Sequence, residues 1–329
     1  MNFLKNNWFI IGIFAALAAG FLFSDAGVFL NTGSYFSTSL VVLLFIITGL
    51  KLPVNSIKYG LKDVRVHIYI QLFIFIFVPL YFFLTSMLFE SSFSPQIIVG
   101  IYALAVLPCT ISSCIVFTQS AGGNVVATMF NAALANIAGV FVSPLLLSLL
   151  LRTSAEVMPA AELLATFRKL ALIMLLPIGA GQVLRRWISG FVDSRKRELG
   201  VVSNIFILLI LYFAFSASAA KPSFVQNLKS MALPYVYLAL SFIVLNAIAT
   251  GGAVLLRFRR EDRITVTFTA PKKTLAMGVP LLTTYFASDA ELLGAALLPL
   301  IFYHPWQLLV SGIIQERVRK RSMELEVEN

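Results

Sequence analysis

Long apolar runs constrain this chain more than any other feature. A transmembrane helix needs about 20 consecutive, mostly apolar residues, and the sequence supplies ten such runs. The predicted spans are residues 8–24, 35–52, 67–89, 95–119, 124–151, 166–186, 199–219, 232–256, 264–287 and 290–315. Charged residues make up 12% of the chain, about half the share of an ordinary soluble domain. The sequence therefore predicts an all-α polytopic membrane protein with ten transmembrane helices in the lipid bilayer.

The basic residues are distributed unevenly between the loops. With the N-terminus placed inside, eighteen of the 25 lysines and arginines lie inside, and five lie outside. The outside set is Arg152, Arg168, Lys169, Lys221 and Lys229. The inside set is Lys5, Lys51, Lys58, Lys62, Arg65, Arg185, Arg186, Arg195, Lys196, Arg197, Arg257, Arg259, Arg260, Arg263, Arg317, Arg319, Lys320 and Arg321. Because short cytoplasmic loops are rich in Lys and Arg, both termini are predicted to be cytoplasmic, in a plasma or inner membrane. This topology also explains the net charge of +10, so no nucleic-acid partner is predicted.

Ten spans divide into two sets of five, residues 1–155 and 156–329. Because five is odd, a second half with the fold of the first would lie inverted in the membrane, as in many secondary transporters. The fourth span of each half is interrupted: "LAVLPCTISSCIVFTQSAGGN" in the first and "ITVTFTAPKKTLAMGVPLL" in the second. Each contains a mid-span proline, Pro108 or Pro271, followed by polar residues. Interrupted spans at corresponding positions indicate a transport site.

Two adjacent lysines, Lys272 and Lys273, are the most unusual residues of the ninth span. Lys272 follows Arg263, at the predicted cytoplasmic edge, by nine residues, or about 13 Å along a helix. The hydrocarbon core is about 30 Å thick, so both lysines lie near its middle, where a charge costs at least about 2.5–3.5 kcal/mol. The 15 acidic residues fall in loops, at span ends or in the tail, so no carboxylate is expected to neutralise the lysines.

Several arrangements would lower this cost. The amines could face water, lose a proton, or take an anionic solute as counter-ion. Alternatively, they could only hydrogen-bond to carbonyls freed by the helix breaks, since an ammonium has three donors. In a mixed arrangement, one lysine ties the broken helices together and the other meets solute or proton. The sequence does not distinguish which lysine faces a cavity, because adjacent helical residues point about 100° apart.

Other polar side chains add candidate ligands from the fourth, fifth, ninth and tenth spans. With the two lysines, the candidate binding residues are Thr110, Ser112, Ser113, Thr128, Asn131, Asn136, Thr274, His304 and Gln307. Each has a structural alternative, because hydroxyls bond back to helix carbonyls and asparagines join neighbouring helices. If sodium is bound, the predicted ligands are Ser112, Ser113, Thr128 and Asn131. No cofactor and no other metal is predicted, and the coupling ion is expected to be a proton or sodium.

Catalytic patterns are missing from the sequence. It has no pair of aspartates within a span, no His-Glu-x-x-His and no convincing Ser-His-Asp set, so an enzyme is not predicted. Cys109 and Cys114 are five residues apart in one apolar segment. This is not a zinc spacing, and the two are expected to be reduced packing residues.

The chain resembles the bile acid/sodium symporter superfamily, in particular its SBF-like branch. The match is carried by "ISSCIVFTQSAGGN" (Ile111–Asn124) with the following "FN" and "SPLL", by "LLPIGAGQVLR" (Leu175–Arg185), by "PKKTLAMGVPL" (Pro271–Leu281) and by "YHPWQ" (Tyr303–Gln307). The resemblance implies two inverted five-helix repeats and a crossing of the broken spans four and nine. It also implies a core domain from spans 3–5 and 8–10 and a panel domain from spans 1, 2, 6 and 7. In sodium-coupled members, sodium lies behind the crossing and an organic anion binds in the adjacent cavity.

The chain departs from that sodium-coupled pattern at the crossing. Those members carry a glutamate near the position of Thr267 and a glutamine just before the polar cluster, where this chain has Thr267 and Pro271. Where they have Ser-Asn in span four, it has Ser113-Cys114. The lysines would also oppose a sodium ion, because two like charges about 4 Å apart repel by roughly 4 kcal/mol at an effective dielectric constant near 20.

These observations predict a secondary transporter of an organic anion, either bile-acid-like or a small carboxylate or sulfate. It would work by alternating access, with Lys272 and Lys273 in place of a sodium ion and with proton coupling as one option. A sodium-coupled symporter and a non-transporting membrane regulator of ion homeostasis are the alternatives. The oligomeric state is left open.

Overall fold

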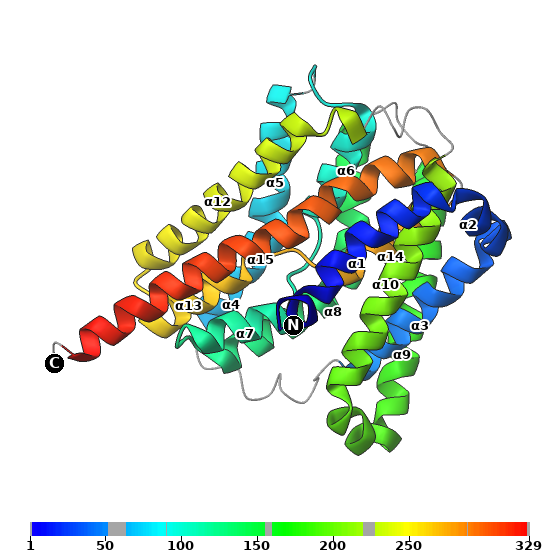
Figure 1. Cartoon of the computed structure of the whole chain (residues 1–329). Helices are drawn as coiled ribbons and strands as arrows, with labels where there is room; N and C mark the ends of the chain where they lie inside the picture. The colour runs from blue at the N-terminus through cyan, green and yellow to red at the C-terminus, as the bar shows by residue number, and fades with distance from the viewer. Residues whose placement is uncertain are drawn as a thin grey trace.

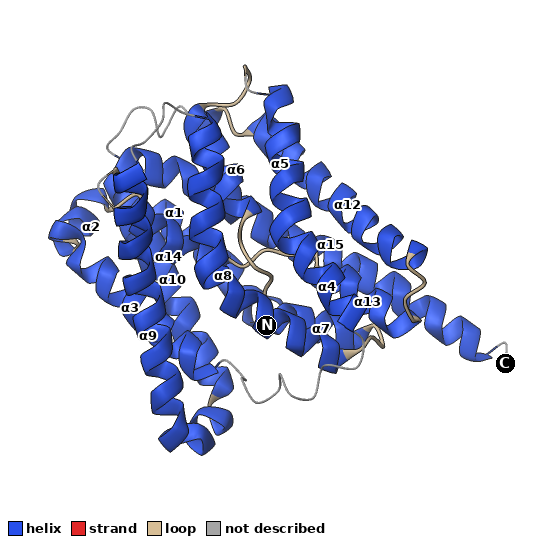
Figure 2. Cartoon of the chain, turned by 180° about the vertical axis from the view of Figure 1, so that it is seen from behind, coloured by secondary structure: helices blue, strands red, loops and turns tan. Residues whose placement is uncertain are grey.

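The computed structural model describes residues 2–51, 64–89, 91–154, 160–219, 228–287 and 289–327. Within these ranges the chain forms helices joined by short loops, without a strand (Figure 2). The first half contains α1 (Asn2–Leu22), α2 (Ser24–Leu30), α3 (Tyr35–Lys51), α4 (Val64–Leu72), α5 (Val78–Ser86), α6 (Pro95–Ala105), α7 (Ser112–Ser120) and α8 (Val125–Ser154). The second half contains α9 (Ala160–Ser194), α10 (Lys196–Ala219), α12 (Ala232–Leu255), α13 (Arg260–Thr269), α14 (Leu275–Tyr285) and α15 (Ala290–Val327) (Figure 1). The predicted all-α class is confirmed.

Length and apolar composition indicate which helices could cross a membrane. Six helical segments of the described ranges are long and apolar enough to cross a bilayer: Thr32–Lys51, Val64–Phe89, Val125–Leu151, Lys196–Ala219, Ala232–Leu255 and Ala290–Lys320. Trp8–Leu22 and Ser24–Leu30, bent by 94° at their junction, form a seventh candidate. The number of ten spans and their division into inverted repeats remain predictions.

The predicted fourth and ninth spans are each two short helices separated by a break. In the fourth, α6 and α7 have 11 and 9 residues and flank residues 106–111. In the ninth, α13 and α14 have 10 and 11 residues and flank residues 270–274. The predicted interruptions at Pro108 and Pro271 are therefore confirmed. Proline lacks an N–H and disfavours helix in the preceding residue, which explains why both helices stop just before these positions.

Close packing of neighbouring helices holds the breaks in place. α3 packs along α9 and α1 along α10, while α15 packs along α6 and α12 (Figure 1). Glycine permits the tightest of these approaches, since a Cβ on Gly181 of α9 would collide with the carbonyl oxygen of Ile46 in α3. The assignment of panel and core domains stays a prediction. The predicted boundary between the two five-helix repeats, at residue 155, lies outside the described residues, as do Lys58, Lys62 and Lys221.

The third span contains a local irregularity that bears on the site. Between α4 and α5, residues Phe73–Phe77 form a π-helix, and the N–H of Val78 donates to the carbonyl of Phe73, five residues earlier. In this register the next donor would be residue 79, pairing with Ile74, but Pro79 has no N–H. The carbonyl oxygen of Ile74 is therefore available to a partner outside the helix.

Candidate functional site at the crossing of the broken helices

The two breaks meet in the middle of the helix array, where Figure 2 shows both loops. The backbone N–H of Thr274 donates to the carbonyl oxygen of Pro108 over 2.9 Å, so the breaks are joined directly by their main chains. Lys272 and Lys273 are 0% and 1% exposed. The predicted site residues Pro108, Thr274, Lys272 and Lys273 thus lie together in a closed, packed region.

Lys273 directs its side chain at the carbonyl end of α6. Its Nζ donates to the carbonyl oxygens of Ala105 and Leu107 over 2.7 and 2.8 Å. A third donation, over 3.2 Å, reaches the carbonyl oxygen of Ile74 in the π-helix. The C-terminal end of a helix carries a partial negative charge, so both the charge and the three donors of the ammonium are matched. Here the alternative in which a lysine ties the broken helices together applies to Lys273.

The remaining carbonyls of the first break are also paired. Ser143 of α8 donates its hydroxyl to the carbonyl oxygen of Val106 over 2.7 Å, and Asn136 donates its amide to that of Cys109 over 2.9 Å. Asn136 also donates to Ala132 of its own helix. The break between α6 and α7 therefore leaves none of the carbonyls from 105 to 109 without a donor, which is the requirement for irregular backbone at membrane depth.

Gln307 of α15 holds the peptide of Lys273 in place. Its Oε1 accepts from the backbone N–H of Lys273 over 2.9 Å, and its Nε2 donates to the carbonyl oxygen of the same residue over 2.7 Å. The same Nε2 lies 3.1 Å from Nδ1 of His304. One helical turn away, the hydroxyl of Tyr303 donates to the carbonyl oxygen of Pro271 over 3.1 Å. The predicted pair His304 and Gln307 therefore supports the second break.

Lys272 has a different environment from its neighbour. Its Nζ lies 4.0 Å from the ring centroid of Phe117 in α7 and 5.7 Å from that of Phe268 in α13. Among the described residues this nitrogen has no hydrogen-bond partner. Cation–π contacts of this kind are worth about 0.5–2 kcal/mol, less than the cost of placing a charge at mid-membrane. Lys272 is thus a buried amine whose hydrogen-bonding capacity is unused.

The hydroxyl-bearing residues that were predicted as sodium ligands fall into separate clusters. Thr128 bonds to the hydroxyls of Thr118 and Thr265, over 3.1 and 3.2 Å, and donates to the carbonyl oxygen of Asn124. Ser113 lies 2.5 Å from the hydroxyl of Thr110, which also contacts the Cys114 thiol at 3.3 Å. Ser112, at the start of α7, is exposed.

Asn131 belongs to a third cluster, which joins the third and fifth predicted spans. Its amide nitrogen lies 2.8 Å from Nδ1 of His67, and Gln71 donates to its side-chain and main-chain oxygens. Sequence reasoning assigned no role to His67 and missed Thr265, Ser143 and Tyr303, whereas Thr118 belongs to the polar residues that it noted in the broken fourth span. These are ordinary polar residues in apolar helices, and only the packing of distant segments brings them to the site.

The residue types at the crossing limit its chemistry. The described residues contain no group of three or more His, Cys, Asp or Glu side chains arranged to hold a metal ion. Cys109 and Cys114 are both free thiols and are buried. The arrangement instead provides two cationic amines, main-chain carbonyls and hydroxyls between short half-helices.

Broken helices whose half-helix ends meet around buried basic groups are typical of the secondary transporters. The model of the SBF-like CPA transporter family matches residues 7–320, and the chain belongs to this family. The chain is therefore an integral membrane transporter rather than an enzyme, and the resemblance seen in the sequence is confirmed.

Individual relatives match over nearly the whole chain. An uncharacterized protein of Pseudomonas aeruginosa, PA2026, is 34% identical over 325 residues, which cover 97% of this chain and 95% of the relative. Sodium/bile acid cotransporter 7 of Rattus norvegicus is 29% identical over 330 residues, covering 96% and 93%. The putative symporter YfeH of Escherichia coli K12 is 30% identical over 321 residues, also covering 96% and 93%.

Proposed function

We propose that the chain is a secondary transporter that moves an organic anion by alternating access, with Lys273 as a tethered cation where a coupling sodium ion would otherwise be held. The observation that carries this proposal is the set of three carbonyl oxygens, from Ala105, Leu107 and Ile74, within 3.2 Å of its ammonium. Carbonyls of unwound helices coordinate sodium in secondary transporters. Here a side chain of the ninth predicted span supplies the positive charge.

Lys272 is the amine that would bind the anionic solute or exchange a proton. Its nitrogen is buried without a hydrogen-bond partner among the described residues, so an anion or proton exchange at this position would compensate its burial. The name of one relative, sodium/bile acid cotransporter 7, favours a bile-acid-like organic anion as the solute. The interruptions of α6–α7 and α13–α14 at corresponding positions support two inverted five-helix repeats, and the distribution of Lys and Arg between the loops supports cytoplasmic termini.

Uptake into liposomes tests the proposal. Purified protein is reconstituted, a proton or a sodium gradient is imposed separately, and a panel of labelled organic anions is supplied. We expect uptake that ignores the sodium gradient and is lost in Lys273→Met but retained in Lys229→Met, which changes an exposed lysine. Sodium-driven uptake by the unaltered protein would contradict the role given to Lys273. Correctly inserted protein without any uptake would favour the non-transporting regulator.

One cluster favours the sodium-coupled alternative. The hydroxyls of Thr118, Thr128 and Thr265 gather around the carbonyl oxygen of Asn124, and such uncharged oxygens are suitable ligands for a hard cation. If this cluster holds the coupling ion, Thr128→Val abolishes a sodium dependence that the unaltered protein shows. The same gradient assay therefore separates the two candidates.

A further inference from the structure

The turn that joins α12 to α13 contains a residue in an unusual backbone conformation. Arg257, one residue beyond the C-cap Leu256, has a φ of 56°, in the left-handed region that glycine usually occupies after a helix. Any other residue is sterically less favourable there, because its Cβ approaches the backbone. The N–H of Arg257 donates to the carbonyl oxygen of Val254 over 2.9 Å, and that of Phe258 donates to Ala253 over 3.1 Å. An arginine therefore closes the end of α12 where glycine would do so at lower cost.

The partial charge of the helix end does not explain this choice. A cation near the C-terminus of a helix is favourable, but a basic side chain in the last turn of α12 would provide it with ordinary helical backbone. The last two positions hold Leu255 and Leu256 instead, which are 82% and 49% exposed. The usual order, with the cation in the last turn and glycine after it, is reversed. The sequence thus places a cation just beyond two exposed apolar side chains.

The turn is fixed in place between two exposed arginines, Arg257 and Arg259. Phe258 is 3% exposed, and its ring centroid lies 5.7 Å from that of Tyr69 in α4. Nε of Arg263 donates to the carbonyl oxygen of Phe258 over 2.7 Å. Among the described residues, no carboxylate pairs with the side chain of Arg257 or Arg259. The buried ring therefore anchors a turn that carries two cations without a counter-ion from the protein.

The charge around the turn stays positive when the neighbouring carboxylates are included. Arg257, Arg259 and Arg260 are exposed, and Glu261 is the exposed acidic residue beside them. Asp262 is buried and accepts a hydrogen bond from an asparagine side chain within the protein. An anionic partner would therefore be attracted to this surface.

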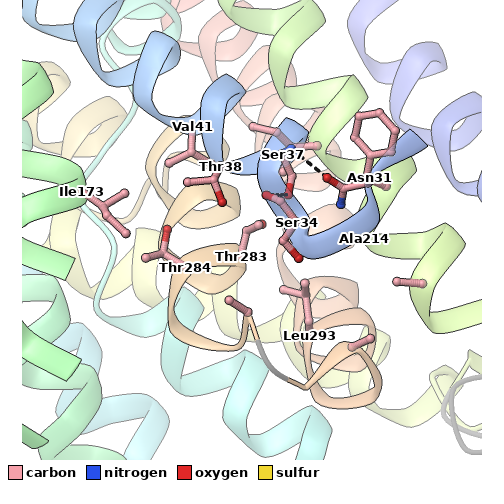
Figure 3. Close-up of a pocket in the computed structure, with 15 residues that line it drawn as sticks. Asn31, Ser34, Ser37, Thr38, Val41, Ile173, Ala214, Thr283, Thr284 and Leu293 are labelled. Atoms are coloured by element: carbon pink, nitrogen blue, oxygen red, sulfur yellow. Dashed lines mark hydrogen bonds between the residues drawn. The ribbon is translucent and has the colours of Figure 1, made fainter. Parts of the chain in front are cut away.

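The position of the turn relative to the bilayer indicates which anion is available. α12 is long and apolar enough to cross a membrane, so the turn lies where such a span leaves the hydrocarbon core. Figure 2 shows it as a tan loop beside the end of α12, toward the C-terminus of the chain. In the predicted topology this is the cytoplasmic surface, whose leaflet contains anionic phospholipids. The pocket shown in Figure 3, which residues of α3, α10 and α14 line, is separate from this turn.

We propose that this turn binds the headgroup of an anionic phospholipid, with Arg257 and Arg259 on the phosphate and Leu255 and Leu256 against the acyl chains. The planar guanidinium presents a fork of donors that matches a phosphate group. A free phosphate ion would use the arginines alone, whereas the exposed leucines beside them fit a lipid. The left-handed backbone at Arg257 is retained, on this view, because it holds the guanidinium at the membrane surface.

Lipid-dependent stability tests the proposal. The full chain, purified in a neutral detergent, is heated with increasing amounts of dioleoyl-phosphatidylglycerol or, separately, dioleoyl-phosphatidylcholine, and the unfolding temperature is recorded. The anionic lipid is expected to raise this temperature more than the zwitterionic lipid does. Arg257→Gly should need about 5-fold more phosphatidylglycerol for half of the rise, the factor expected for one basic residue near an anionic surface.

The choice of glycine separates lost lipid binding from damage to the fold. Glycine adopts a φ of 56° without steric cost, so in detergent without phospholipid Arg257→Gly should unfold at the same temperature as the unaltered protein or at a higher one. Arg257→Lys keeps the charge and should keep the preference for phosphatidylglycerol. Lys229→Gln is the matched control, because Lys229 is an exposed cation at the other end of α12, and its response to both lipids should be unchanged.

Several results would overturn the proposal. One is an equal response of the unaltered protein to the two lipids, and another is an unchanged requirement for phosphatidylglycerol in Arg257→Gly. Equal stabilisation by inorganic phosphate would assign the arginines to a free anion instead of a lipid. No transported solute enters the measurement, so its result is independent of the uptake assay. The preference for phosphatidylglycerol should persist in Lys273→Met, whose uptake tests the proposed function alone.

Discussion

Lys273→Met should destabilise the folded protein more than Lys272→Met. Each variant removes one buried ammonium, so the gain from no longer burying a charge cancels between them. Lys273→Met loses three hydrogen bonds to carbonyl oxygens, worth about 2–5 kcal/mol in total at about 0.6–1.7 each within a membrane. Lys272→Met loses cation–π contacts with Phe117 and Phe268, worth about 0.5–2 kcal/mol.

The expected difference in unfolding free energy is thus about 2 kcal/mol, or roughly 30-fold in the unfolding equilibrium. It can be measured by titrating SDS into each variant in mixed micelles and following the loss of helical circular dichroism. Because methionine replaces lysine in both, the change in side-chain volume is the same.

The roles given to the two lysines require Lys273→Met to be less stable than Lys272→Met. Equal unfolding midpoints would show that the three carbonyl contacts of Lys273 contribute no more than the aromatic contacts of Lys272. A less stable Lys272→Met would mean that Lys272, rather than Lys273, ties the broken helices together.

Three further predictions follow from the same geometry. Lys273→Ser should expose the carbonyl oxygens to a small cation. Sodium, at ten times the dissociation constant of its complex with this variant, should therefore stabilise the variant by about 1.4 kcal/mol and leave the unaltered protein unaffected. Equal stabilisation of both proteins would contradict a tethered cation. Asn136→Ala should lower the unfolding free energy by about 1–3 kcal/mol, because the carbonyl of Cys109 loses its hydrogen-bond donor. An unchanged SDS concentration at the unfolding midpoint would argue against that bond. Gly181→Ala should collide with backbone in α3, whereas Gly179→Ala has open space, so only the first should lower the thermal unfolding temperature of the purified protein.

The sequence was sufficient to locate the breaks and the buried charges. Pro108 and Pro271 interrupt apolar runs, and their effect on a helix is local, so no knowledge of neighbouring segments is needed. The depth of Lys272 and Lys273 follows in the same way from counting residues from Arg263. Both lysines are buried, and their depth in the bilayer stays a prediction.

The partners of these groups depend on contacts between distant segments. Lys273 bonds to Ile74, 199 residues away, and that carbonyl is free only because a π-helix meets Pro79. Phe117 and Phe268 are two of 29 phenylalanines, with no sequence signal that marks them as the rings beside Lys272. Neither contact was predictable from the pattern of residues along the chain.

Lys272 and Lys273 are consecutive in the second break, but their side chains contact different helices. Their different contacts indicate different roles. Lys273 holds the carbonyl end of α6 and is itself clamped by Gln307 at both its N–H and its carbonyl. Moving α6 away from the second break would require the bonds from the Lys273 ammonium to the carbonyl oxygens of Ala105 and Leu107 to be lost together. Among the described residues, the nitrogen of Lys272 has no hydrogen-bond partner and lies near the aromatic rings of Phe117 in α7 and Phe268 in α13, which it can leave without stranding a carbonyl. Within the proposed mechanism, Lys273 is therefore the fixed cation of the crossing, and Lys272 is the one that exchanges partners.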